Sequence, residues 1–481
     1  MVELLNNPYG NSAFDEFRQD ERAFADKSLI IKYLDDNKIS RYPVLLRPRR
    51  FGKSTFVRML RCYYDISYKD RYEELFSGTG IYEEHLTTHN SYHVINFDFS
   101  SIYVKNYETL TDGFYAAVIA GIDNFKRRYR KFQFDYSKLN TEDPVTLFNY
   151  FATAYSNYFN EKKLYVMIDE YDNFANEILS KDLDLFLTIT GQNGLLKSFY
   201  AAIKSQTGDA IARTFITGVS SVSLDSLTSG FNIARNVSDM ACFNEYAGFT
   251  GDELNLLIPK LVDTESLGIT VDEIIRRMQP VYDGYCFSGE SDRTVYNSSM
   301  CLYYLDKVRE KGVFLDPENC LDPACDQDGS KLEELFRLAD RDTADQIIDR
   351  YLQDEPFKLD RIAENINLNK LKEYSREQLL SMMYYLGYLT IKTNSAKNGR
   401  LSLIVPNQFM KKLFAGCTIK FRFRNNTEFK ARKLDISALM AEDDDLSSFA
   451  FSCTHFLSVI MSNQVLCHMN EMALNLILYA K

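Results

Sequence analysis

The sequence predicts an α/β fold in which helices cover both faces of a parallel sheet and a mostly helical region follows. Short apolar runs alternate with segments of helical periodicity in the first half of the chain, which is typical of a covered parallel sheet. Leu164–Ile168 is almost continuously apolar, as a strand buried on both faces requires. From about residue 246 helical periodicity predominates, so a second region is expected there.

Four strands are predicted in the first region, which begins with a polar, helical stretch over residues 1–40. Tyr42–Leu46 is the first strand, and a glycine-bearing loop joins it to a helix over Phe56–Tyr64. Strand, loop and helix in this order are what a phosphate-binding loop requires. The later elements are strand Tyr92–Phe99, helices over 105–133 and 144–162, strand Lys163–Ile168, a helix around 192–205 and strand Arg213–Val219.

The second region ends in a pattern typical of a winged helix. A helix is expected over Arg376–Leu386, followed by strands Tyr388–Lys392 and Leu401–Val405 that the polar turn Thr393–Arg400 joins. Such modules bind DNA in some proteins and serve as protein-contact lids in others, and both interpretations stay open. We expect a first domain over 1–245, a helical lid over 246–365 and a winged-helix-like and connecting region over 366–464.

Composition excludes several classes of protein. The 481 residues carry a net charge of −11, which argues against a protein that coats DNA through its overall charge. Nine scattered cysteines favour reduced thiols over a disulfide framework. The N-terminus lacks the features of a signal peptide, and no run of about 18 apolar residues predicts a membrane span. We therefore expect a cytoplasmic protein that does not span a membrane.

The loop after the first strand is a candidate phosphate-binding loop. Gly52, Lys53 and Ser54, followed by Thr55, fit the end of the motif G-x-x-x-x-G-K-[ST], in which the lysine reaches the phosphates and the hydroxyl holds magnesium. The first glycine of the motif is replaced by Arg47, so we expect the loop to turn differently. Arg49, Arg50 and Phe51 complete the predicted nucleotide-binding segment, to which the two arginines add positive charge. A tripeptide this short also occurs by chance.

Two carboxylates follow the third strand. Asp169 and Glu170 come directly after Leu164–Ile168, and ligands of open α/β sheets lie at the carboxyl ends of the strands. We predict that Asp169 holds magnesium together with Ser54 and that Glu170 polarises the attacking water. An exposed acidic turn is the alternative. Because the loop and the carboxylates occur independently and in the right order, the sequence favours ATP and magnesium as ligands of a P-loop NTPase.

Three further residues are weaker candidates. Thr217 ends the fourth strand, where a polar residue beside the acidic strand would sense the γ-phosphate; the alternative is a threonine that caps the strand. Arg213 and Arg235 are candidate charge-stabilising arginines, in cis or in trans, although surface arginines are common.

Several segments together resemble a known family. The string Arg47–Ser54 resembles the signature of the bacterial AAA-ATPase-like family, in which ATPases are usually followed by a PD-(D/E)XK nuclease domain. Further similar segments extend the resemblance over nearly the whole chain: Phe24–Ser28, Ile168–Asp172, Phe215–Val219 with Asn232, Tyr282–Tyr285, Val295–Ser299 and Ile404–Asn407. The resemblance accounts for Arg47, which the family carries in place of glycine, and it implies ATP-dependent activity.

The resemblance also implies a nuclease module after about residue 465. Asn470–Asn475 resembles its first helix, and Glu471 its leading acidic residue, but the sequence ends at Lys481 without the Asp and Glu-x-Lys that bind the metal and orient the attacking water. Glu428–Lys430 has the Glu-x-Lys spacing but precedes that helix, which favours chance. Residues 465–481 are therefore predicted to be the first helix of a truncated nuclease-like module.

The partners stay open. Basic clusters over Lys126–Lys131 and Lys420–Lys433, with aromatic residues between the charges, could contact a nucleic-acid backbone, although solvated helix faces are commoner. The first hypothesis is an ATP-hydrolysing protein that couples its nucleotide state to DNA or to a protein client, with oligomerisation possible. The second is a nucleotide-dependent scaffold with little turnover, and the third is the remnant of an ATPase–nuclease fusion.

Overall fold

The computed structural model describes residues 4–36, 39–137, 139, 142–161, 163–179, 182–190, 194–221, 227, 229–323, 326–364, 374–398 and 400–422. The predicted nuclease-like helix at 465–481, Glu428–Lys430 and most of the basic cluster Lys420–Lys433 lie outside the described residues.

The centre of the first region is a parallel sheet, as predicted, but with five strands rather than the four expected from the sequence. Its order is β2-β3-β4-β1-β5, with β1 at Pro43–Leu46, β2 at His93–Asp98, β3 at Leu164–Asp169, β4 at Ile211–Gly218 and β5 at Arg235–Asn236. Because Leu46 pairs with Gly218 and Asp98 with Asp169, the carboxyl ends of β1 to β4 meet at one edge of the sheet. Strand β4 separates the loop-bearing strand β1 from the acidic strand β3.

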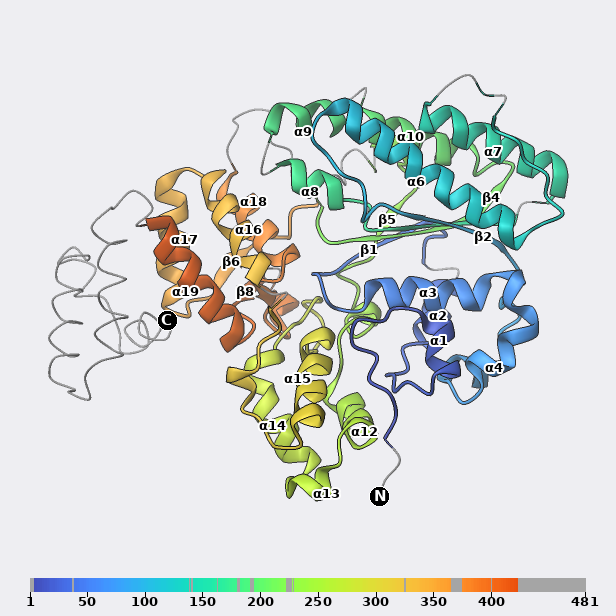
Figure 1. Cartoon of the computed structure of the whole chain (residues 1–481). Helices are drawn as coiled ribbons and strands as arrows, with labels where there is room; N and C mark the ends of the chain where they lie inside the picture. The colour runs from blue at the N-terminus through green and yellow to red at the C-terminus, as the bar shows by residue number, and fades with distance from the viewer. Residues whose placement is uncertain are drawn as a thin grey trace, which may run out of the picture.

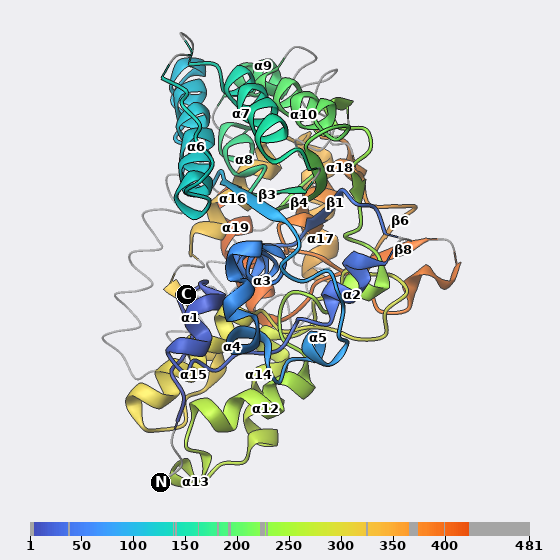
Figure 2. The ribbon, with the colours of Figure 1, turned by 90° about the vertical axis from the view of Figure 1, so that its right-hand side faces the viewer.

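Helices cover both faces of this sheet (Figures 1 and 2). One layer contains α6 (Tyr107–Arg128), α7 (Pro144–Phe159), α8 (Asn173–Leu179), α9 (Leu183–Thr190) and α10 (Leu195–Ser205). The opposite layer contains α1 (Phe14–Gln19), α2 (Ile30–Asp35), α3 (Lys53–Tyr64), α4 (Tyr72–Phe76) and α5 (Gly80–Glu83). Burial of every residue of β3 agrees with its apolar sequence and its position inside the sheet.

The second region is mostly helical, as expected from its periodicity. One group of helices contains α12 (Gly251–Leu261), α13 (Thr264–Leu267), α14 (Val271–Tyr282) and α15 (Ser298–Lys311). The other, beside it in Figure 1, contains α16 (Asp326–Arg337), α17 (Arg341–Leu352), α18 (Arg376–Tyr385) and α19 (Gln408–Arg422). Among the described residues, no helix is both long enough and apolar enough to cross a membrane.

The predicted helix and hairpin near the C-terminal end are present with shorter strands. Helix α18 is followed by β7 (Thr390–Ile391) and β8 (Leu401–Ile404), which pair antiparallel. A third strand, β6 (Phe357–Leu359), pairs with the other edge of β8. Strand β6 was not expected from the sequence, because three residues are too few to show a strand period.

Segments far apart in sequence meet at Gly284, between α14 and the segment after β8. Asn407 Nδ2 donates to the Asp283 carbonyl at 2.7 Å. Gly284 has φ +96°, and a Cβ atom there would lie 2.0 Å from the Pro406 carbonyl oxygen. The two segments singled out by resemblance, Tyr282–Tyr285 and Ile404–Asn407, therefore form one joint that needs a glycine.

We expect Gly284→Ala to lower the free energy of unfolding by about 3 kcal/mol, because the alanine meets both backbone strain and a main-chain clash. Gly268→Ala is a matched control: its φ is +64°, but no atom lies within 4 Å of the added Cβ. Gly268→Ala should lower the free energy of unfolding only by the backbone strain, about 1 kcal/mol. Urea unfolding followed by circular dichroism measures both, and equal losses would contradict the clash.

Candidate functional site

The loop between β1 and α3 has its left-handed backbone conformations near its end, next to α3. Gly52 has φ +81° and Arg50 has φ +69°, whereas Arg47 does not adopt a positive φ. The expectation that the loop turns differently at Arg47 is therefore confirmed. Gly52 stands directly before α3, so the first amide groups of that helix lie in the loop, where an anion would be favoured.

Arg47 is a buried structural residue with only 1% of its surface exposed. Its guanidinium donates to the carbonyls of Leu46 (2.7 Å), Ser238 (2.8 Å) and Phe243 (2.6 Å). It also lies over the Phe287 ring, 4.2 Å from the centroid. The residue that replaces the first glycine of the motif therefore ties the start of the loop to the chain that follows the sheet.

The second region holds the rest of the loop. The Arg50 carbonyl accepts bonds from Ser298 Oγ at 3.1 Å and the Ser299 amide at 3.2 Å. The Phe51 carbonyl accepts from the Gly248 amide at 3.0 Å. The Phe51 ring packs 4.8 Å from the ring of Tyr285, centroid to centroid. A Cβ on Gly387 would lie 3.0 Å from Pro48. These contacts run from the loop to segments more than 190 residues away along the chain.

Lys53 links the loop to the acidic strand end. Its side chain is 3% exposed, and its Nζ lies 3.5 Å from Glu170 Oε1. The same ammonium donates to the Pro48 carbonyl at 3.1 Å. The structure thus brings together the two residues that the sequence predicted to bind phosphate and to polarise water.

Ser54 and Asp169 form the second contact between the loop and β3. The Ser54 hydroxyl lies beside the Asp169 carboxylate and acts to lower its pKa. Burial raises the pKa of Asp169 to about 6, and the neighbouring charge of Glu170 acts in the same direction. A buried carboxylate beside a hydroxyl offers the hard oxygen ligands that magnesium prefers. These residues therefore fit the predicted metal.

The pKa of Asp169 gives a prediction for the metal-free protein. Because its folded pKa is about 6 against 3.8 for the free side chain, the native state holds a proton that the unfolded state releases between those values. Asp169 then lowers stability progressively as pH rises from about 4 to about 6, by up to about 3 kcal/mol.

Asp169→Asn removes this titration. The difference in unfolding free energy between the variant and the wild type should therefore grow in favour of the variant from about pH 4 to about pH 6 and then stay constant. Urea unfolding at several pH values with a chelator present measures it. A difference independent of pH would contradict the raised pKa.

Glu170 and Asp172 differ in their surroundings. Glu170 has φ +52°, a left-handed conformation that is uncommon for a residue with a side chain. Asp172 is fully buried and accepts bonds from the amides of Val219 (3.0 Å) and Ser220 (2.6 Å). Burial raises the pKa of Asp172. Asp172 thus fastens the turn after β3 to the end of β4, a role that the sequence analysis missed because its partners lie more than 40 residues away.

Thr217 lies near the carboxyl end of β4, as predicted, but its hydroxyl donates to the Leu45 carbonyl of β1 at 2.7 Å. Only 1% of the residue is exposed. Arg49, in the loop, donates to Asn173 Oδ1 at 2.9 Å, so it lies beside the segment that follows Glu170.

The hypothesis that Arg213 or Arg235 stabilises charge at this site in cis is wrong. Arg213 is buried near the amino end of β4, where it pairs with Asp35 and donates to the Leu34 carbonyl. Arg235 begins β5 and pairs with Pro43, the first residue of β1. Both therefore lie toward the sheet edge opposite the loop, a placement that depends on strand pairing rather than on local sequence.

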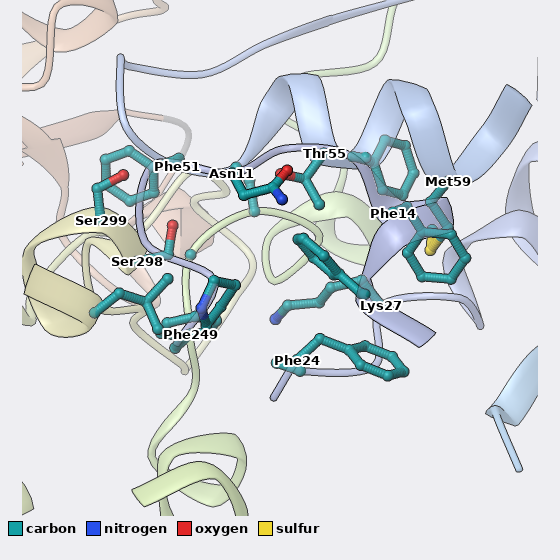
Figure 3. Close-up of a pocket in the computed structure, with 18 of the residues that line it drawn as sticks. Asn11, Phe14, Phe24, Lys27, Phe51, Thr55, Met59, Phe249, Ser298 and Ser299 are labelled. Carbon is teal, nitrogen blue, oxygen red and sulfur yellow. The ribbon is translucent and has the colours of Figure 1, made fainter. Parts of the chain in front are cut away.

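An apolar cavity of about 140 Å³ adjoins the loop. In Figure 3, Phe14, Phe24 and Met59 approach it from one side and Phe51, Ser298 and Ser299 from the other. Gly52 and Thr55 also line it.

Lys27 adds a charge to this cavity. Its Nζ donates to Glu253 Oε2 at 2.6 Å and to the Glu245 carbonyl at 2.8 Å. Burial lowers the pKa of Lys27, although Glu253 acts to raise it. The cavity is thus built from the N-terminal segment, α3 and the second region.

The basic cluster Lys126–Lys131 at the end of α6 is partly structural. Arg128 Nε lies 3.2 Å from the fully buried Asp65 carboxylate, and its guanidinium also donates to the Val94 carbonyl. Arg127, Arg130 and Lys131 remain exposed.

Comparison with known proteins found one family-model match and a similar solved structure. Residues 8–228 match the model of the AAA-ATPase-like family, described as predicted AAA-ATPase, and this segment contains Lys53, Asp169 and Glu170. A solved structure of a Walker-type ATPase from Pyrococcus abyssi is similar at 14% identity and a TM-score of 0.43, covering 81% of this chain and 96% of its own. No curated protein matches significantly.

Proposed function

We propose that the chain binds ATP with magnesium through the loop Arg49–Thr55 and hydrolyses its terminal phosphoanhydride bond. The observation that carries this proposal is the meeting of two pairs of residues at one sheet edge. Lys53 lies 3.5 Å from Glu170, and Ser54 lies beside Asp169. A lysine, a hydroxyl and two carboxylates in this arrangement can bind a triphosphate, hold its metal and activate water.

The loop residues have distinct roles in this proposal. Lys53 exchanges its contacts with Glu170 and the Pro48 carbonyl for the β- and γ-phosphates. Gly52 supplies the left-handed turn that exposes the first amides of α3. Arg49 and Arg50 add positive charge, and Phe51 anchors the loop in the aromatic core. Thr55 faces the apolar cavity, which offers a site for the adenine ring.

Ser54 and Asp169 would hold magnesium, which supplies charge neutralisation for the phosphates when it is bound. Binding of the cation favours the Asp169 carboxylate over its protonated form, so occupancy should weaken as pH falls below about 6. Asp98 pairs with Asp169 across β2 and β3 and adds negative charge nearby.

Glu170 is the proposed water-activating residue. In its ion pair with Lys53 its carboxylate is partly neutralised, so transfer of Lys53 to phosphate would free Glu170 to accept the proton of an attacking water. The positive φ of Glu170 sets the direction of its side chain. Thr217 acts through its bond to Leu45, which fixes β4 against the strand that carries the loop.

The second region would couple nucleotide state to a partner. The bonds from Gly248, Ser298 and Ser299 hold loop carbonyls, so a change in the loop alters contacts of the proposed lid over 246–365. A movement of the loop would also alter the close contact between Pro48 and Gly387, which belongs to the proposed region over 366–464. The partner is DNA or a protein client, and the exposed arginines of the 126–131 cluster favour testing DNA first.

Phosphate release from ATP and magnesium tests the proposal, with and without DNA. Turnover should be present in the wild type and in Lys311→Ala, an exposed control outside the basic cluster, and absent in Lys53→Ala. Stimulation by DNA would support the DNA partner. ATP binding without release would support the alternative of a nucleotide-dependent scaffold, whereas equal release by Lys53→Ala would contradict the proposed site.

A further inference from the structure

A second, larger cavity of about 670 Å³ lies on the other side of α3. Its walls are α3 and α6, with Asn96 and Asp98 of the edge strand β2 between them. It reaches Ser54 and Asp169, the proposed metal ligands. We call it the α3–α6 cleft. Its volume falls within the range of about 300–1,000 Å³ that is usual for small-molecule sites.

The cleft is separate from the apolar cavity beside the loop. Ser54, Arg58 and Arg61 line the cleft, whereas Thr55 and Met59 line the apolar cavity. On a helix with about 3.6 residues per turn, these two sets lie on different faces, about 110° apart. A nucleotide with its base in the apolar cavity therefore leaves the length of the cleft beyond Ser54 free.

One end of the cleft is closed. Beyond Arg61 and Asn124, the last lining residues of the two helices, Asp65 and Arg128 form an ion pair at 3.2 Å. The edge of β2 is also covered there, because the Val94 amide donates to Tyr129 Oη at 3.1 Å. Because a polymer would have to leave the cleft at this closed end, the cleft favours a compact ligand.

The charges of the cleft are divided between its ends. Arg58 is exposed, and within the described chain no hydrogen bond or ion pair engages its guanidinium. Arg61 donates to Tyr68 Oη at 3.1 Å, while its buried Nε has no partner among the described residues. At the end nearest the loop stand Asp98 and Asp169. A ligand is thus met by cations at one end and carboxylates at the other.

The α6 wall leaves room for such a ligand. It is lined by small residues: Gly113, Ala116, Ala117, Ala120 and Gly121. Gly121 is also needed for packing, because a Cβ there would lie 2.6 Å from the Phe97 ring. The three alanines add no charge or bulk to the cleft wall, so Arg58 and Arg61 are the positively charged groups that line the cleft.

We propose that the α3–α6 cleft binds a small phosphate-bearing molecule next to the nucleotide. Its phosphate binds Arg58, which has no ion-pair partner among the described residues, and Arg61, whose Nε has none, because guanidinium groups favour phosphate oxygens. Its hydroxyl or amino groups face Asp98. The carboxylates at the other end disfavour a continuous phosphate chain, which excludes single-stranded nucleic acid as the occupant. Because the cleft shares Ser54 and Asp169 with the proposed ATP site, the two ligands should alter each other's affinity reciprocally.

Pyrophosphate is the probe for this site. The full chain is first saturated with a non-hydrolysable ATP analogue and magnesium, so that the loop is occupied, and pyrophosphate is then titrated by calorimetry. We expect one further binding event in the wild type. Arg58→Glu should weaken it by about tenfold or more. Arg341→Glu makes the same charge change at a site that is 83% exposed on α17 and should leave the affinity unchanged.

The result that overturns the inference is no second event in the wild type, or equal affinity in Arg58→Glu. The test also separates this inference from the proposed function. If the ATP analogue itself does not bind, the nucleotide proposal fails, and the titration is repeated without it in Lys53→Ala. Pyrophosphate binding that persists in Lys53→Ala and is lost in the double variant with Arg58→Glu supports the cleft alone. If Lys53→Ala does not bind pyrophosphate, the proposal that the cleft is a phosphate-binding site is contradicted.

Discussion

Glu170→Gln should abolish ATP turnover while ATP binding is retained. The amide keeps the size of the side chain but cannot accept the proton of the attacking water, so turnover should fall by about a hundredfold to ten-thousandfold. The ion pair between Lys53 and Glu170 at 3.5 Å is lost as well. The phosphates then no longer compete with a carboxylate for the Lys53 ammonium. The ATP affinity of the variant should therefore be equal to or higher than that of the wild type.

Single-turnover measurements with labelled ATP check this prediction, since they separate binding from the chemical step. Glu161→Gln is a matched control, because Glu161 precedes the other end of β3 and its side chain is 54% exposed. That variant should behave like the wild type. Normal turnover in Glu170→Gln would assign water activation to another residue.

Arg47→Gly should unfold or inactivate the chain although it restores the glycine of the common motif. The substitution removes a buried guanidinium that satisfies the carbonyls of Leu46, Ser238 and Phe243. It also leaves a cavity beside Tyr246 and Phe287. Losses of this kind cost about 3–5 kcal/mol. ATP affinity should fall in parallel, because the start of the loop loses its anchor.

Thermal unfolding and ATP-analogue titration measure both effects. Arg47→Lys keeps the charge but cannot form the same set of bonds, so it should show an intermediate loss. Arg341→Gly, at the exposed start of α17, controls for the loss of an arginine. Unchanged stability in Arg47→Gly would mean that Arg47 does not hold the loop.

The sheet and the loop could be predicted from sequence because their signals are local. An apolar run predicts β3, and Gly52, Lys53 and Ser54 stand where strand gives way to helix. Asp169 and Glu170 follow a strand, so their edge of the sheet was predictable once the strands were taken as parallel. The meeting of Lys53 with Glu170 follows from that topology.

The contacts made over long sequence separations could not be predicted in the same way. The burial of Arg47 depends on carbonyls at 238 and 243, and the pairing of Arg213 depends on Asp35. In the sequence, Asp172 has the appearance of one residue of an acidic turn. Its structural role depends on the amides of Val219 and Ser220, which only the placement of β4 brings beside it. The short strand β6 and the cleft between α3 and α6 also arise only when segments far apart in sequence pack together.

The most direct test of the proposed nucleotide site is equilibrium binding of ATP with magnesium to the wild type and to Lys53→Ala, measured by calorimetry with a chelator-treated sample as the metal-free control. We predict saturable binding of one ATP to the wild type that weakens when magnesium is removed and is lost in Lys53→Ala. No saturable binding to the folded wild type, or equal binding to Lys53→Ala, would contradict it.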